Sequence, residues 1–247
     1  MIVTSSQNAV LKRLRALYKD KKLRLQEGVF IAEGVNLVKD IPTDYKVETL
    51  FIKESKAKDL RYIEEKIGIE AHIVKDGLFD AVAEQVTPSG IIALVEKKAP
   101  PAHPEGDTVL LLDGISDAGN MGTIIRTAAA RGVKTIICAD CTDAFSPKCV
   151  RAAMSGTFRV SIIETTLSGA LELLYDYDII GLDMDGKCIY GYRKGDKKIA
   201  IAVGNEAHGL SEKTRNAISE KLSIPMENGM ESLNAAVSAG IAMYLIR

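Results

Sequence analysis

In the N-terminal part of the chain, apolar positions follow two different periods. Apolar side chains recur at helical spacing over residues 10–18, and two further helical patterns cover 55–67 and 76–85. Between them lie apolar runs of strand length, at 29–34, 47–53 and 90–96. This succession predicts a small N-terminal α/β sandwich of about 95 residues.

The alternation is stronger in the C-terminal part. Six apolar runs have the length of buried strands: 108–113, 133–139, 159–164, 178–184, 199–204 and 221–226. Helical patterns follow most of them, at 119–131, 146–155, 167–176, 211–219 and 232–246. Nearly continuous apolar strands that alternate with helices are typical of a parallel sheet covered on both faces. We therefore predict a second, larger α/β domain with a parallel sheet.

A proline-rich stretch separates the two patterns. Residues 97–107 contain Pro100, Pro101 and Pro104, three of the seven prolines in the chain. Because proline fixes φ and lacks an amide donor, such a stretch is typical of an extended linker. We predict domains at 1–97 and 108–247, with 98–107 as the linker.

The composition is that of an ordinary globular protein, with 247 residues, 47% apolar and 26% charged side chains. No apolar run approaches the roughly 20 residues of a membrane span, and the N-terminus lacks a signal-peptide pattern, so we expect a cytoplasmic protein without a membrane partner. Cys138 and Cys141 form a C-x-x-C pair, but no second pair or suitably spaced histidine accompanies it. We expect a buried core thiol here and no metal site.

Positive charge is concentrated near the N-terminus. The net charge of the chain is −1, yet seven basic residues and a single acid lie between Lys12 and Arg24. Clustered cations are the usual mark of a phosphate-binding face, so Lys12, Arg13 and Arg15 are candidate RNA contacts. A solvated helix face would give the same pattern.

Three loops that follow predicted strands carry polar residues and glycines, and ligands of parallel sheets bind beyond the carboxyl ends of strands. The first loop, 113–122, leads into the helix that carries Arg126. It suggests a dinucleotide site, but the fingerprint G-x-G-x-x-G is absent. The second loop is 204–211. In the third, 224–234, Ser232 and Asn234 precede the last helix, where helix capping alone would explain either residue.

The last helical pattern is apolar on every side. Small residues such as Ala235, Ala239 and Gly240 alternate with bulky residues such as Ile241 and Tyr244, and no broad face is polar. Such a helix must be buried almost all round. We favour a homodimer interface over a purely internal position.

The three loops, in this order and at this spacing, resemble the signature motifs of the SpoU/TrmH family of RNA ribose 2′-O-methyltransferases, part of the SPOUT superfamily. The first motif is matched by Asn120-x-Gly122-x-x-x-Arg126-Thr127-Ala128, the second by Gly204-Asn205-Glu206-x-x-Gly209-Leu210, and the third by Ile224-Pro225-Met226 with Ser232-Leu233-Asn234. There are two departures from the family pattern: Ala118 replaces a common proline, and Ser155 falls in a region, 147–159, where the family commonly has glycine. In the N-terminal part, Gln7-Asn8, Lys12 and residues 30–34 resemble the family's ribosomal-protein-like substrate-binding domain.

The resemblance implies a deep trefoil knot in the C-terminal domain, S-adenosyl-L-methionine as cofactor, and a homodimer. By position, it implies that the cofactor is bound by Gly204, Ile224 and Leu233. It also implies a catalytic group formed by Asn120, Arg126, Glu206, Ser232 and Asn234. The substrate would be structured RNA, with ribosomal RNA favoured over transfer RNA because of the N-terminal domain.

The chemistry of the transfer constrains the role of Arg126. A guanidinium stays protonated in proteins, so we expect it to act electrostatically on a phosphate or a developing alkoxide, and not as a base. His208 is the alternative base. Three other functions stay open: a base-directed knotted methyltransferase, a non-catalytic RNA-binding or ribosome-assembly protein, and, more distantly, a nicotinamide dehydrogenase.

Overall fold

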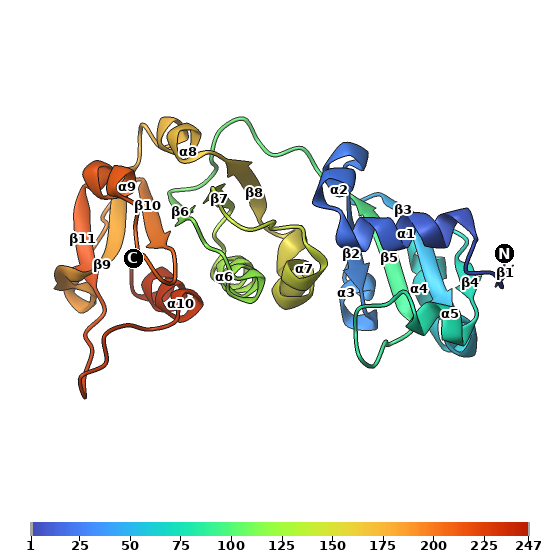
Figure 1. Ribbon diagram of the computed structural model, residues 1–247. Helices are drawn as coiled ribbons and strands as arrows, with labels where there is room; N and C mark the ends of the chain where they lie inside the picture. Colours follow the sequence, from blue (N-terminus) through green and yellow to red (C-terminus); the bar gives the residue numbers. More distant parts are fainter. Residues whose placement is uncertain (1, 247) are drawn as a thin grey trace. The chain divides into compact units, whose positions relative to one another are not determined.

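Two separate sheets organise the chain in the computed structural model, which describes residues 2–246 (Figure 1). One structural unit contains the residues up to Ala99 together with Phe145–Ser155. The other contains Pro100–Ala144 and the residues from Gly156 onward. Among the described residues, no helix combines the length and the apolar character needed to cross a membrane.

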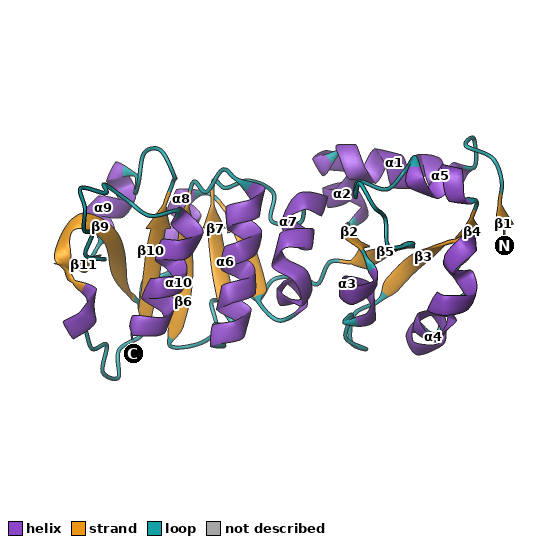
Figure 2. Cartoon of the chain, turned by 90° about the horizontal axis from the view of Figure 1, so that it is seen from below, coloured by secondary structure: helices purple, strands orange, loops and turns teal. Residues whose placement is uncertain are grey.

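The first unit contains a mixed five-stranded sheet in the order β1-β4-β3-β5-β2. Its strands are β1 (Ile2–Val3), β2 (Val29–Glu33), β3 (Val47–Lys53), β4 (His72–Val74) and β5 (Ile91–Glu96). Its helices are α1 (Ala9–Lys19), α2 (Lys21–Glu27), α3 (Val35–Lys39), α4 (Ala57–Ile67) and α5 (Asp76–Asp80). Helices α1 and α5 cover one face of the sheet and α3 and α4 the other (Figure 2). This is the predicted small α/β sandwich.

Helix α1 shows how the local sequence builds this unit. The side chain of Asn8 accepts a hydrogen bond from the amide of Val10 and thereby caps the helix. Leu11, Leu14 and Leu17 follow at helical spacing and are fully buried against the sheet. The basic residues of α1 lie outside this buried stripe.

The second unit contains a six-stranded sheet in the order β11-β9-β10-β6-β7-β8, and all neighbouring strands are parallel. Its strands are β6 (Thr108–Asp113), β7 (Thr135–Ala139), β8 (Ser161–Thr165), β9 (Asp178–Cys188), β10 (Ile199–Gly204) and β11 (Glu220–Ser223). Its helices are α6 (Ala118–Arg131), α8 (Leu167–Leu173), α9 (Glu212–Ala217) and α10 (Ala235–Leu245). Helices α6 and α10 lie side by side on one face, and α8 and α9 cover the other (Figure 2). The predicted C-terminal α/β domain with a parallel sheet is confirmed.

The sheet has a switch point between its two central strands. From β6 the chain continues outward through β7 and β8, whereas β10 lies on the other side of β6 and leads to β11 at the opposite edge. Gly204, at the end of β10, pairs with Asp113 at the end of β6. The loops after these strands therefore start next to each other, at the place where parallel sheets bind ligands.

One segment leaves the second unit. Residues Phe145–Ser155, which contain α7 (Pro147–Ala153), follow β7 in the chain but belong to the first unit. The ring of Phe145 lies 5.5 Å from that of Phe30, and Arg151 Nη1 lies 3.8 Å from Glu33 Oε2. Short 3-10 helices complete the chain: Glu54–Lys56, Met154–Phe158 and Ile189–Gly191.

Candidate active site

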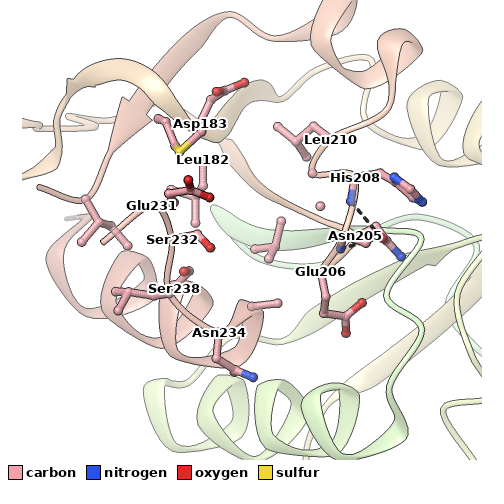
Figure 3. A pocket seen from close by; sticks show the side chains of 18 of the residues that line it. Leu182, Asp183, Asn205, Glu206, His208, Leu210, Glu231, Ser232, Asn234 and Ser238 are labelled. Atoms are coloured by element: carbon pink, nitrogen blue, oxygen red, sulfur yellow. Dashed lines mark hydrogen bonds between the residues drawn. The ribbon is translucent and has the colours of Figure 1, made fainter. Parts of the chain in front are cut away.

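A cavity of about 580 Å³ opens at the carboxyl ends of the central strands of the second unit (Figure 3). Its walls come from the middle of β9, from residues 203–210 after β10, and from residues between 222 and 238 around the start of α10. The predicted cofactor residues Gly204, Ile224 and Leu233 all line this cavity.

Gly204 lies where two backbone segments approach too closely for a side chain. A Cβ atom on Gly204 would lie 2.2 Å from the carbonyl carbon of Gly209 and 2.3 Å from the amide nitrogen of Leu210. Gly209 itself has a φ of +67°, in the left-handed region that favours glycine. Asn205 and Gly209 exchange two backbone hydrogen bonds of 2.9 Å. The two glycines thus allow residues 204–210 to form a tight loop along the cavity wall.

The side chain of Asn205 holds this loop in place. Its Oδ1 atom accepts hydrogen bonds from the backbone amides of Ala207 (2.9 Å) and His208 (3.1 Å). Its Nδ2 atom donates to the carbonyl oxygen of Gly114 at 2.8 Å. The loop after β10 is therefore tied to the loop after β6.

Glu206 is the centre of a hydrogen-bond network with the loop after β6. Its carboxylate accepts bonds from Ser116 Oγ (3.0 Å), from the backbone amides of Ser116 (3.3 Å) and Asp117 (3.4 Å), and from Asn120 Nδ2 (2.9 Å). Partial burial acts to raise the pKa of Glu206, but the bonds from Asn120 and Ser116 outweigh it and hold the pKa below its ordinary value. Glu206 is therefore an ionised acceptor at neutral pH.

The network continues to the last helix. Asn234 Nδ2 donates to Asn120 Oδ1 at 2.9 Å, and Asn234 Oδ1 accepts from the amides of Ala236 and Val237. Asn234 is thus both the N-cap of α10 and the third member of a chain from Glu206 through Asn120. The oxygen and nitrogen of the Asn234 side-chain amide cannot exchange places. The amides at the start of α10 require an acceptor, and Asn120 Oδ1 requires a donor.

The remaining predicted site residues lie around this network. Ser232 and His208 line the cavity. Arg126 is exposed on α6, lies outside the cavity lining, and makes no hydrogen bond or ion pair within residues 2–246. A Cβ atom on Gly156 would lie 3.0 Å from the Cα atom of Arg126, so glycine at this position lets the chain pack directly against α6.

The basic residues of the first unit divide into two groups. Arg13 forms hydrogen-bonded ion pairs with Glu48 (2.9 Å) and Glu27 (2.8 Å), and the bond to Glu48 is the largest cause that raises its pKa. Arg24 is buried and donates to the carbonyl oxygens of Leu17 and Tyr18. Lys12 is exposed, and half-buried Arg15 donates to the carbonyl oxygen of Ser6. Two of the basic residues therefore stabilise the fold.

Sequence reasoning missed three charged residues of the cavity lining, Asp183, Arg215 and Glu231. Asp183 lies within β9, and Arg215 Nη1 lies 3.4 Å from its Oδ2 atom. For Asp183 the sequence did contain a signal, because this acid interrupts the apolar run 179–184 of a predicted strand. Ser116, whose hydroxyl donates to Glu206, lies in the loop 113–122, which was a predicted part of the site, but no role was predicted for this residue.

The cavity is suited to a nucleoside-like cofactor. Leu182, Leu210 and Leu222 supply apolar walls, and the loop of residues 204–210 supplies close backbone. Apolar walls with few convergent polar groups are typical of such sites. Within residues 2–246, no group of three or more His, Cys, Asp or Glu side chains is placed to hold a metal ion.

Two family models match the chain. The SpoU rRNA Methylase family matches residues 107–244, and an MRM3-like substrate binding domain matches residues 8–93. The two matches cover the second and the first unit respectively, and together they account for most of the chain.

Individual proteins and solved structures agree with these matches. The chain is 30% identical to the 23S rRNA (guanosine(2553)-2′-O)-methyltransferase RlmP of Bacillus subtilis, over 99% of this chain and 98% of the relative. An AdoMet-bound rRNA methyltransferase from Sinorhizobium meliloti is 28% identical, with a TM-score of 0.87 over 99% of this chain and 96% of the other. The SpoU methyltransferase AviRb of Streptomyces viridochromogenes, in complex with AdoMet, is 25% identical, with a TM-score of 0.87 over 97% of each chain.

Proposed function

Because the chain belongs to the SpoU rRNA methylase family, we propose that it transfers the methyl group of S-adenosylmethionine to a ribose 2′-hydroxyl of ribosomal RNA. The observation that carries the proposal is the hydrogen-bond chain Glu206–Asn120–Asn234, which joins all three family motifs at the edge of one cavity. RlmP and the Sinorhizobium meliloti enzyme are rRNA methyltransferases by name, and the Sinorhizobium meliloti and AviRb structures contain AdoMet.

The cavity provides the residues that hold the cofactor. Gly204 admits the close backbone of the 204–210 loop, and Ile224 and Leu233 supply apolar contact. When bound, the sulfonium group supplies an electrophilic methyl group that needs no further activation. The protein must then orient and polarise the ribose hydroxyl of the RNA, which is the nucleophile.

The network fixes the polar groups that would meet this hydroxyl. Glu206 is ionised and orients Asn120, which in turn orients Asn234, so neither amide can rotate without losing a hydrogen bond. Ser232 lies on the cavity wall two residues before Asn234. Preorganised dipoles of this kind stabilise developing charge without reorganisation.

We assign Arg126 the role of contacting the RNA substrate. Its guanidinium is exposed and has no partner among residues 2–246, so it is free to pair with a phosphate or with the developing alkoxide. Because it keeps its proton, its contribution is electrostatic. A planar guanidinium matches phosphate geometry in a way that an ammonium does not.

The substrate-binding face is assigned to one side of α1. Lys12, Arg15 and Lys19 are spaced i, i+3 and i+7 and so follow one line along the helix, beside the row of buried leucines. Arg13 points instead to Glu27 and Glu48. A row of cations on a substrate-binding domain is suited to an RNA backbone.

The functional form is assigned as a homodimer that uses α10. Val237 and Tyr244 on this helix are each 48% exposed, and Tyr190 nearby is 62% exposed. The helix is apolar on all sides, so a second copy would remove these side chains from water.

Methyl transfer tests the proposal. Purified protein and S-adenosylmethionine with a labelled methyl group are incubated with ribosomal RNA from a strain that lacks the gene, with ribosomal RNA from its parent, and with transfer RNA. We expect incorporation into the first RNA only, since the parental RNA already carries the modification. Cofactor binding without incorporation into any of the three would instead indicate a non-catalytic RNA-binding protein.

A further inference from the structure

Glu231 offers a free carboxylate on the wall of the cavity. It lies in the segment 224–234 before α10, is exposed, and lines the cavity together with Ser232 (Figure 3). Within residues 2–246, its side chain forms no hydrogen bond or ion pair. Both carboxylate oxygens are therefore available to a molecule that enters the cavity.

The other two carboxylates of the cavity lining are already engaged. Glu206 accepts four hydrogen bonds from residues 116–120. The carboxylate of Asp183 points away from the cavity (Figure 3), and Arg215 Nη1 lies 3.4 Å from its Oδ2 atom. Of the described acids that line the cavity, Glu231 alone is left without a partner.

The place of this charge points to a cationic ligand. The proposed reaction brings RNA phosphates to the cavity, and an unbalanced carboxylate there repels them. Arg215, the one arginine or lysine among the described lining residues, is held by Asp183 and by the carbonyl oxygen of Leu210. A bound cation would supply the counter-charge that these residues do not give to Glu231.

S-adenosylmethionine carries two cationic groups, which differ as hydrogen-bond donors. Its sulfonium has no N–H or O–H to donate, whereas its α-ammonium has three N–H donors. The hydroxyls and the base amino group of its adenosine part can donate, but they are uncharged and would leave the charge of Glu231 unbalanced. Hydrogen bonds from an ammonium to a carboxylate are charge-assisted and stronger than neutral ones. The α-ammonium alone offers both the donor and the charge.

We propose that Glu231 is a cofactor-specificity residue, whose carboxylate binds the α-ammonium of S-adenosylmethionine. This inference rests on the proposed function, since it takes the cavity to be the S-adenosylmethionine site. Glu231 adds recognition of the amino-acid part of the cofactor to a wall that Gly204, Ile224 and Leu233 otherwise form through backbone and apolar surface.

Calorimetric titration of the full-length protein at neutral pH and low salt tests this assignment without relying on turnover. The probes are S-adenosylmethionine, S-adenosylhomocysteine, which lacks the sulfonium charge, and the deamino analogue of S-adenosylhomocysteine, which also lacks the ammonium. The variant is Glu231→Gln, which keeps the size of the side chain and removes its charge. Glu227→Gln is the matched control, because Glu227 is an exposed glutamate of the same segment and lies outside the cavity lining.

For wild type and Glu227→Gln, we expect the deamino analogue to bind about tenfold more weakly than S-adenosylhomocysteine, as for a lost hydrogen bond between charged groups. Glu231→Gln should bind S-adenosylmethionine and S-adenosylhomocysteine each about tenfold more weakly than wild type does. It should bind the deamino analogue within about twofold of wild type, because the ion pair that the substitution removes is absent from that complex.

Three results for Glu231→Gln would overturn the inference alone. They are wild-type affinity for S-adenosylhomocysteine, an equal loss of affinity for the deamino analogue, and a loss confined to S-adenosylmethionine, which would assign the charge to the sulfonium. Failure of the wild type to bind both S-adenosylmethionine and S-adenosylhomocysteine would contradict the proposed function as well. Thermal melting without ligand should place Glu231→Gln within about 2 °C of wild type, since the side chain is exposed.

Discussion

Substitution of Gly204 by alanine probes the loop on which the cavity depends. The added methyl group would lie 2.2–2.4 Å from the backbone of Gly209 and Leu210, so that backbone must retreat by roughly 1 Å to reach ordinary van der Waals contact. The two Asn205–Gly209 hydrogen bonds, now 2.9 Å long, would then exceed bonding distance. Overpacking costs about 1–3 kcal/mol and each lost bond about 0.5–1.5 kcal/mol.

The middle of the summed ranges, about 4 kcal/mol, corresponds to a fall in melting temperature of about 8–16 °C. Because the same backbone forms the cavity wall, the affinity for S-adenosylmethionine should fall at least about tenfold. Thermal melting and calorimetric titration measure the two effects. Gly191→Ala is the control, since a Cβ there meets nothing within 4 Å, and it should melt within about 2 °C of wild type. A Gly204→Ala protein with wild-type melting and wild-type affinity would refute the close-approach argument.

Four further substitutions test separate parts of the protein. Arg126→Lys keeps the charge but loses the planar fork, so turnover should fall at least about tenfold while calorimetric S-adenosylmethionine affinity stays unchanged; full turnover would exclude a bidentate role. Glu206→Gln should melt about 2–4 °C below wild type at neutral pH. Because the folded pKa of Glu206 is depressed, the stability it adds is present above pH 4.5 and is lost as the pH falls through the folded pKa, so the gap should narrow in acid; a gap independent of pH would contradict the ionised network. Lys12→Gln should weaken RNA binding and reduce the slope of log affinity against log salt by about 0.7–0.9, whereas Arg13→Gln should mainly lower the melting temperature; equal effects on RNA binding would contradict the division between them.

The parallel sheet could be predicted because its strands are long apolar runs. Strand β10 covers the run predicted at 199–204, and β6 the run at 108–113. Strands β1 and β4 were not predicted, because two or three residues are too few to show an alternation of apolar and polar positions. The last helix begins at Ala235 and not at residue 232, because Asn234, and not Ser232, supplies the capping oxygen. A sequence with two candidate caps does not indicate which of them the helix uses.

The candidate site was partly predictable for a topological reason. Loops that follow neighbouring parallel strands meet at one edge, so Asn120, Glu206 and Asn234 could be expected to converge, and hydrogen bonds now connect them. The roles of the basic residues were not predictable, because the partners of Arg13 lie 14 and 35 residues away in the chain. A charge cluster does not show which of its members are already paired.

Two features expected from the family resemblance concern the region around Ser155 and the trefoil knot. Ser155 falls in a region where the family commonly has glycine, and within this region Gly156 makes the close approach to Arg126. The trefoil knot stays a prediction that rests on the resemblance, since strand order and pairing alone do not establish how the chain threads through itself.

The central claim is that this cavity serves methyl transfer to a ribose hydroxyl. The most direct test is the chemical identity of the product. Ribosomal RNA that has been methylated by the purified protein is digested to nucleosides and analysed by mass spectrometry. We predict a single nucleoside with the added methyl on its 2′-oxygen, formed at least about tenfold more slowly by Arg126→Lys than by the wild type. A methyl group on the base would contradict it.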